Sequence, residues 1–204
     1  MYTHDLTNQS QPQASSSKLP ASGCVYTKER FKHSFLQFIR NSASKNARLV
    51  LIDREVYGDN PKAKRWIAQA GIEPYVIWLK PSRPTGFTRN ELVDIYSLCD
   101  VVADQFGDIG GFGCIALEAC ACARPVVTRI DETIVSRLYP WHPLLNAATP
   151  AEIAARFEDL QRHPETLAEK GAQGRRWIEQ FHSHEVAGPL YAARLRQAAS
   201  LAPV

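Results

Sequence analysis

One segment of the sequence concentrates residues that could bind an anionic ligand. Residues 104–124 read DQFGDIGGFGCIALEACACAR, with four glycines from Gly107 to Gly113 and an apolar stretch after them. Glycines let the backbone approach a ligand closely, and the amides at the start of a following helix attract phosphate. Glycine at such a turn also occurs for structural reasons alone, and the spacing does not give the GxGxxG pattern of dinucleotide-binding proteins.

Glu118 is the only charged residue between positions 109 and 123, where its neighbours are Ala, Leu, Cys and Ile. A helix this apolar is expected to be buried, and a buried carboxylate is costly without hydrogen-bond partners. Two interpretations stay open: Glu118 pairs with a structural arginine or caps backbone amides, or it accepts hydrogen bonds from ligand hydroxyls. It lies roughly 10 Å along a helix axis from the glycines, which suits a phosphate at the helix start and a sugar ring beside it.

Short apolar runs alternate with amphipathic stretches along the rest of the chain. Strands are expected at 24–26, 47–52, 75–79, 100–106, 125–127 and 144–147, and helices at 31–39, 60–71, 88–96, 114–123, 149–160 and 165–199, the last broken near 181–184 and 188–189. This alternation predicts an α/β fold with a doubly wound parallel sheet, as one Rossmann-like domain over 23–204. Ligands of such sheets bind at the carboxyl ends of the strands. Positions 1–22 are polar and are expected to form a disordered tail.

The segment resembles the retaining GT-B glycosyltransferases, also called the glycosyl transferases group 1 family. That family carries a pattern like E-G-F-G-x-x-x-L-E-A-M-A-x-G-x-P-V-V, and this chain has GFG at 111–113, ALEACA at 116–121 and RPVV at 124–127. Similar stretches at 91–102, 149–153 and 174–177 extend the resemblance to roughly residues 28–195. It implies the C-terminal, nucleotide-sugar-binding half of a GT-B fold.

The resemblance also implies roles for single residues. Glu118 would hold the ribose hydroxyls, while the turn of Gly110, Gly111, Phe112 and Gly113 would hold the diphosphate. As catalytic residues, Lys28 would neutralise the phosphates and Asp108 would stand in for a glutamate that contacts the donor sugar. Trp78 and Lys80 end the third expected strand, where the family stacks or pairs the base; core packing of Trp78 is the equal alternative. The chain departs from the family at Gly110, where that glutamate is expected, and at Gly23, where an arginine is expected.

The implied activity is transfer of a glycosyl group from a nucleotide-diphosphate sugar, with no metal in the site and no other cofactor. GT-B enzymes have two Rossmann-like domains, and this chain has the length of one. We therefore also expect a separate acceptor-binding domain or subunit as partner, with peripheral membrane association through that missing half. The alternative is a non-catalytic interaction module or one half of a split transferase. A flavodoxin-like domain is a weaker hypothesis, since no acidic cluster ends the first expected strand.

Other classes are disfavoured. A net charge of +3 on 204 residues is too weak to argue for nucleic-acid binding. No G-x-S-x-G elbow or P-loop motif occurs, and neither the five cysteines nor the six histidines have the spacing of a metal site. No apolar run has the length of a membrane span, and the polar N-terminus does not read as a secretory signal. Cysteines in apolar stretches suggest reduced thiols and a cytoplasmic protein.

Overall fold

The computed structural model describes residues 38, 47–53, 60–83, 86–107 and 111–200, together with the backbone of 22–25. Most of the predicted tail and of the predicted helix at 31–39 lies outside these residues. Within them, the six expected strands are all present and form one parallel sheet. The strands are β1 (Ser22–Val25), β2 (Arg48–Ile52), β3 (Val76–Leu79), β4 (Val101–Ala103), β5 (Val126–Thr128) and β6 (Leu145–Asn146).

The sheet has the strand order β3-β2-β1-β4-β5-β6, and every neighbouring pair is parallel. This is the order of a doubly wound Rossmann-type sheet, so the predicted fold class is confirmed. The fourth strand is shorter than predicted and ends at Ala103. After Ala103 the chain turns towards the helix that begins at Cys114. Asp104 and Gln105 form hydrogen bonds with the loop that precedes this helix.

The described part of the chain contains seven α-helices. They are α2 (Asn60–Ala70), α3 (Arg89–Leu98), α4 (Cys114–Ala121), α5 (Glu132–Leu138), α6 (Pro150–Arg162), α7 (Leu167–Phe181) and α8 (His184–Ser200). Both predicted capping boxes are confirmed: at Thr88, the hydroxyl accepts from the backbone of Glu91 at 3.1 Å, and Thr149 does the same with Glu152 at 3.3 Å.

Two helix predictions were wrong. The chain forms α5 where no helix was predicted; its seven residues are too few for a periodic signal, and the Asp131 side chain caps it through the amide of Thr133 at 2.8 Å. The expected break at 188–189 is absent, because α8 runs through Pro189. A proline in the second turn of a helix removes a single backbone hydrogen bond close to the helix start. The break near 181–184 is confirmed, since α7 ends at Phe181 and α8 begins at His184.

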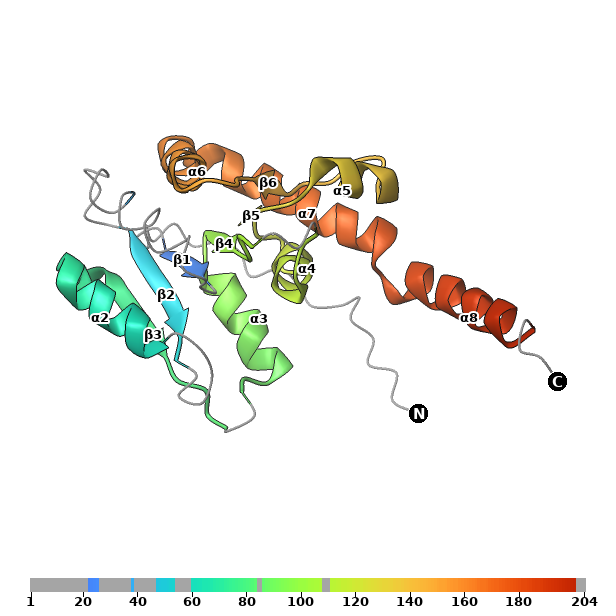
Figure 1. Ribbon diagram of the computed structural model, residues 1–204, viewed down its shortest axis with the longest axis horizontal. Coiled ribbons are helices and arrows are strands. Elements are labelled where there is room, and N and C mark those ends of the chain that lie inside the picture. The colour runs from blue at the N-terminus through green and yellow to red at the C-terminus, as the bar shows by residue number, and fades with distance from the viewer. Residues whose placement is uncertain are drawn as a thin grey trace.

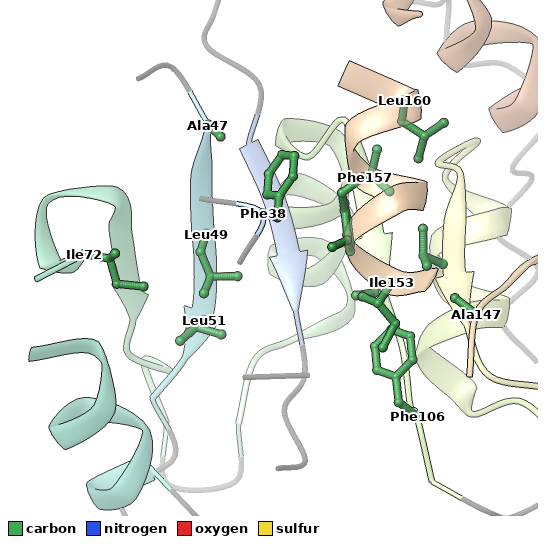
Figure 2. Packing of buried hydrophobic residues seen from close by; sticks show 14 of the residues in the cluster. Phe38, Ala47, Leu49, Leu51, Ile72, Phe106, Ala147, Ile153, Phe157 and Leu160 are labelled. Atoms are coloured by element: carbon green, nitrogen blue, oxygen red, sulfur yellow. The ribbon is translucent and has the colours of Figure 1, made fainter. Parts of the chain in front are cut away.

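The helices cover the two faces of the sheet in two separate cores. The core on one face includes Ile67 of α2, Leu49 and Leu51 of β2, and Ile153 and Phe157 of α6. Figure 2 shows Phe38 beside Phe157 of α6 in this core. On the other face, α3, α4, α5 and α7 pack over alternate strand residues, Val50, Val102 and Val126 among them. Alternate residues of a strand point to opposite faces, so strands buried on both sides read as continuous apolar runs.

The helices α4 and α7 pack closely, side by side, on the second face (Figure 1). Two glycines of α7 make this approach possible, because Gly171 lies against the carbonyl of Ala123 and Gly174 against Cys120. Ala123 has a φ of 53°, the left-handed conformation that ends many helices and that glycine adopts most easily. Arg175 of α7 donates to the carbonyl oxygen of Ala121 at 2.8 Å and thereby satisfies the end of α4.

Candidate functional site

The topology of the sheet identifies where a ligand would bind. From β1 the chain proceeds to β2 and β3 on one side, and from β4 to β5 and β6 on the other, so the direction switches between β1 and β4. Ligands of open α/β sheets bind outside the carboxyl ends of the strands at this switch point. The helix that begins beside the end of β4 is α4, which has Gly113 at its N-cap and Glu118 in its second turn.

Asp104, the first residue after β4, caps the start of α4. Its side chain is only 3% exposed, and its Oδ2 accepts a hydrogen bond from the backbone N–H of Gly113 at 2.6 Å. A Cβ at Gly113 would come within 2.9 Å of both carboxylate oxygens, so this close approach requires glycine there. The carboxylate thus acts like an N-cap side chain, although it comes from the residue that directly follows β4. Sequence reasoning missed it, because an acid nine residues ahead of the cap matches no local capping pattern.

Burial raises the pKa of the Asp104 carboxyl above its usual value, while hydrogen bonds from the backbone amides of Gly113, Gln105 and Ala116 oppose the rise. A raised pKa in the folded state means that the carboxyl favours folding most below its unfolded pKa of 3.8 and that this contribution is lost as the pH rises through the folded value.

We therefore expect the stability of the wild type, relative to Asp104→Asn, to decrease as the pH rises above about 4. Asparagine keeps an acceptor for the Gly113 amide but cannot ionise. Urea denaturation of both proteins between pH 3 and pH 7 measures the difference in the free energy of unfolding. A difference that stays constant or grows with pH would contradict this interpretation.

A second hydrogen bond holds the loop between β4 and α4 close to the start of α4. Gln105 donates from Nε2 to the carbonyl oxygen of Gly111 at 3.1 Å. The carbonyl of Gln105 in turn accepts from the Thr128 hydroxyl at 3.0 Å and from the Arg129 amide at 2.9 Å. The end of β5 therefore fixes Gln105, and Gln105 fixes the residues just before α4.

Glu118 is half-buried on α4, and its Oε2 accepts a hydrogen bond from the hydroxyl of Tyr96 at 2.8 Å. Tyr96 lies on α3 and is 5% exposed. No ion pair between described residues includes Glu118, and its partner is neither an arginine nor a backbone amide. In the sequence, Tyr96 is only the last residue of the expected helix at 88–96, and no local signal links positions 22 residues apart.

The ring of Phe112 belongs to an aromatic cluster. Its ring centroid lies 5.2 Å from that of Trp177 and 6.1 Å from those of Tyr139 and His182. Trp177 is fully buried, and neither its Nε1 nor the Nε2 of His182 has a hydrogen-bond partner among the residues that the structure describes. Burial also lowers the pKa of His182. Because its ring belongs to this cluster, a role of Phe112 in ligand binding would fall to its backbone.

Trp78 and Lys80 lie at the end of β3. Next to this strand end is an ion pair of Lys64 with Asp53, the residue that follows β2. Lys64 donates to Oδ2 of Asp53 at 2.7 Å, and its Nζ lies 5.2 Å from the centroid of the Trp78 ring. The hydrogen bond from Lys64 is the main cause that lowers the pKa of Asp53. Trp78 also packs against the core, and Lys80 is exposed. The predicted contact of these two residues with a base stays a prediction.

The comparison with solved structures finds glycosyltransferases. Sucrose-phosphate synthase of Thermosynechococcus elongatus superposes with a TM-score of 0.69 at 14% identity, over 90% of this chain and 46% of that one. Anabaena HepE in complex with UDP-glucose gives 0.66 at 16%, over 90% and 50%. The C-terminal domain of the group 1 glycosyl transferase LpcC of Francisella tularensis gives 0.58 at 17%, over 81% and 89%.

The chain has the fold of the C-terminal half of a GT-B glycosyltransferase. It spans about half the length of sucrose-phosphate synthase and of HepE, and most of the isolated LpcC domain. Neither protein-family models nor curated proteins match the sequence. At identities of 14–17%, the likeness shows the fold alone.

Within this fold, the predicted site residues do not all come together, since Trp78 and Lys80 lie at the end of β3. The structure brings Gly111, Gly113 and Glu118 together on α4 and at its start. Lys28, Asp108 and Gly110 lie outside the described residues. The described part of the chain contains no cluster of His, Cys, Asp and Glu that could hold a metal ion. None of its helices combines the length and hydrophobicity needed to span a bilayer.

Proposed function

We propose that this chain is the donor domain of a glycosyltransferase, which binds a nucleotide-diphosphate sugar for transfer of its glycosyl group to an acceptor. The observation that carries the proposal is Glu118, a half-buried acid on the apolar helix at the switch point whose partner is a neutral hydroxyl. The binding site comprises the carboxyl ends of β1 and β4, the loop that follows β4, and α4.

The chemistry of Glu118 suits a ligand rich in hydroxyl groups. A carboxylate accepts up to four hydrogen bonds, and the described residues supply one, from Tyr96 to Oε2. A cationic partner would neutralise the negative charge of Glu118, whereas the phenol of Tyr96 leaves this charge in place. Two adjacent ribose hydroxyls are donors that such an acid binds strongly, because hydrogen bonds to a charged group are stronger than neutral ones.

The start of α4 supplies two amides for a phosphate. The amide of Gly113 already donates to Asp104, and the amide of Ala116 donates to the carbonyl oxygen of Gly113. The amides of Cys114 and Ile115, at the first two positions of the helix, have no acceptor within it. Lys28 would neutralise the phosphates and Asp108 would contact the donor sugar. Stabilisation of the leaving diphosphate would then be electrostatic and would need no metal.

Bound ligands of the structural neighbours support the same class of donor. Anabaena HepE is described in complex with UDP-glucose and with UDP, and Staphylococcus aureus TarM in complex with UDP. A retaining reaction is part of the proposal through the sequence resemblance. A cytoplasmic location also belongs to it, in agreement with the four free cysteines of the described residues.

Calorimetry with UDP, GDP and ADP tests the proposal. We expect one of them to bind, and we expect Glu118→Gln to weaken it by roughly 10-fold or more, since a hydrogen bond to a charged group contributes about 1.5–3 kcal/mol. The control is Glu169→Gln, because Glu169 is an exposed acid on α7 whose side chain accepts from Gln173 at 3.3 Å. No heat from any of the three nucleotides at millimolar concentration would reject the proposal.

A second candidate function is that of an interaction module or of one half of a split transferase. The observation that favours it is α8, in which no residue is buried and which extends from the end of α7 away from the sheet (Figure 1). Leu190, Tyr191 and Leu195 on this helix are between 62% and 72% exposed. A separate acceptor-binding domain or subunit would cover them, and any membrane association would come through that partner. Transfer activity that appears only when a second polypeptide is added would support this function.

A further inference from the structure

The hydrogen bond between Tyr96 and Glu118 connects two helices that follow different strands. Tyr96 lies near the end of α3, and Glu118 lies in the second turn of α4. The ring of Tyr96 is buried in the same core cluster as Cys99, Ala119 and Cys120. Its hydroxyl is 2.8 Å from Oε2 of Glu118.

We propose that Tyr96 is a positioning residue, which orients Glu118 for two adjacent hydroxyls of a ribose and so makes the site selective for ribonucleotides over 2′-deoxyribonucleotides. This inference rests on the proposed function of the site. It adds a residue on α3 to a site otherwise built from the strand ends, the loop after β4, and α4.

The packing of Tyr96 makes its hydroxyl a fixed donor. The helix α3 begins at a complete capping box, and the ring of Tyr96 is enclosed by the core. A glutamate side chain has three rotatable bonds and loses much rotamer freedom when it is held in one place. Tyr96 holds Oε2 before any ligand binds, so less of this entropy has to be lost on binding.

The type of partner matters as much as its position. Tyr96 satisfies one oxygen without cancelling the charge, and Oε1 has no partner among the described residues. A carboxylate held in this way accepts hydrogen bonds and donates none, so it recognises hydroxyl groups. Ribose offers two neighbouring donors and 2′-deoxyribose offers one, and only a fixed carboxylate meets both in the correct geometry.

Calorimetry with ribonucleotide and 2′-deoxyribonucleotide pairs tests the inference. The ligands are UDP, GDP and ADP, each with its 2′-deoxy form, and the proteins are the wild type and Tyr96→Phe. The variant keeps the buried ring and removes only the hydroxyl. We expect the affinity for the ribonucleotide to fall about 10-fold and the affinity for the deoxy form to change much less, so that the ratio of the two decreases.

A double-mutant cycle shows whether Tyr96 acts through Glu118. In a Glu118→Gln background, Tyr96→Phe should produce little further loss of affinity. The matched control is Tyr75→Phe, because Tyr75 packs against the core on the opposite face of the sheet. This control should leave the ratio of ribonucleotide to deoxyribonucleotide affinity unchanged.

The outcomes separate the inference from the proposed function. If the wild type binds a nucleotide through Glu118 but Tyr96→Phe leaves the ratio unchanged, the inference is wrong and the proposed function stands. Equal losses for both sugars, with lowered thermal stability, would assign Tyr96 a purely structural role and also overturn the inference. Absence of binding by every protein and ligand would reject both.

Discussion

Substitution of Gly171 by alanine is expected to lower the free energy of unfolding by about 3 kcal/mol or more. A Cβ at this position would overlap with the carbonyl oxygen and carbon of Ala123 at the end of α4. Both are backbone atoms and cannot rotate away, so α7 would have to move off α4. Since α7 also carries Trp177 into the core, the shift would disturb the second face of the sheet. Urea denaturation followed by circular dichroism measures the loss.

Two other glycine-to-alanine changes serve as controls. At Gly174 the new Cβ would lie 3.2 Å from Sγ of Cys120, a tight contact that the gain of about 1 kcal/mol in helix propensity should largely offset. At Gly111 nothing lies within 4 Å, so alanine fits without steric conflict. If Gly171→Ala proved as stable as Gly174→Ala, the close approach of α4 and α7 would not be essential to the fold.

Replacement of Trp177 by alanine is expected to cost about 3–5 kcal/mol, the usual range for a fully buried tryptophan. Trp177 is 0% exposed, and its ring contacts those of Phe112, Tyr139 and His182, with centroids 4.5–5.2 Å apart. The cavity would open between α7 and Phe112, which precedes Gly113, the N-cap residue of α4. Chemical denaturation at pH 8, where His182 with its lowered pKa is neutral, gives the cleanest measurement.

Two variants show whether the cost comes from lost packing. Trp177→Phe should lose clearly less stability than Trp177→Ala, because it keeps an aromatic ring and removes an indole N–H for which the described part of the chain offers no hydrogen-bond partner. Trp141→Ala should also lose less, since Trp141 is only partly buried and donates to Gln180 at 3.2 Å. A loss at Trp141 equal to that at Trp177 would contradict the central role of Trp177.

The cluster around Trp177 bears on the candidate site as well as on stability. Phe112 fixes the loop after β4 from the side of α7, while Gln105 and Asp104 fix it from the side of the sheet. The start of α4 is thus held from two directions before a ligand arrives. A preorganised loop reduces the entropy that ligand binding must overcome.

The site also departs from a simple phosphate cradle. When ionised, Asp104 places a negative charge at the N-terminus of α4, and burial raises the pKa of this carboxyl. A diphosphate at the neighbouring amides of Cys114 and Ile115 would lie close to the same carboxylate. Lys28 would offset this repulsion in the proposed site, which makes its contribution to binding a sensitive test of where the diphosphate lies.

Local patterns in the sequence determined most of the fold. The apolar run at 47–52 predicts a strand buried on both faces, and the run at 125–127 predicts a further strand. The capping boxes at Thr88 and Thr149 predict the starts of α3 and α6. These signals depend on residues a few positions apart, so they can be read along the chain. The short helix α5 was not predicted, because its seven residues carry too weak a periodic signal.

The tertiary structure alone decided which side chains meet. Tyr96 reaches Glu118 across 22 positions, Asp104 reaches Gly113 across nine, and Phe112 meets a tryptophan on a helix far along the chain. Glu118 stood out in the sequence as an isolated acid in an apolar stretch, but nothing nearby in the chain indicated a phenol as its partner. Periodicity tells which face of a helix is buried, whereas the residue that lies opposite depends on how the helices pack on the sheet.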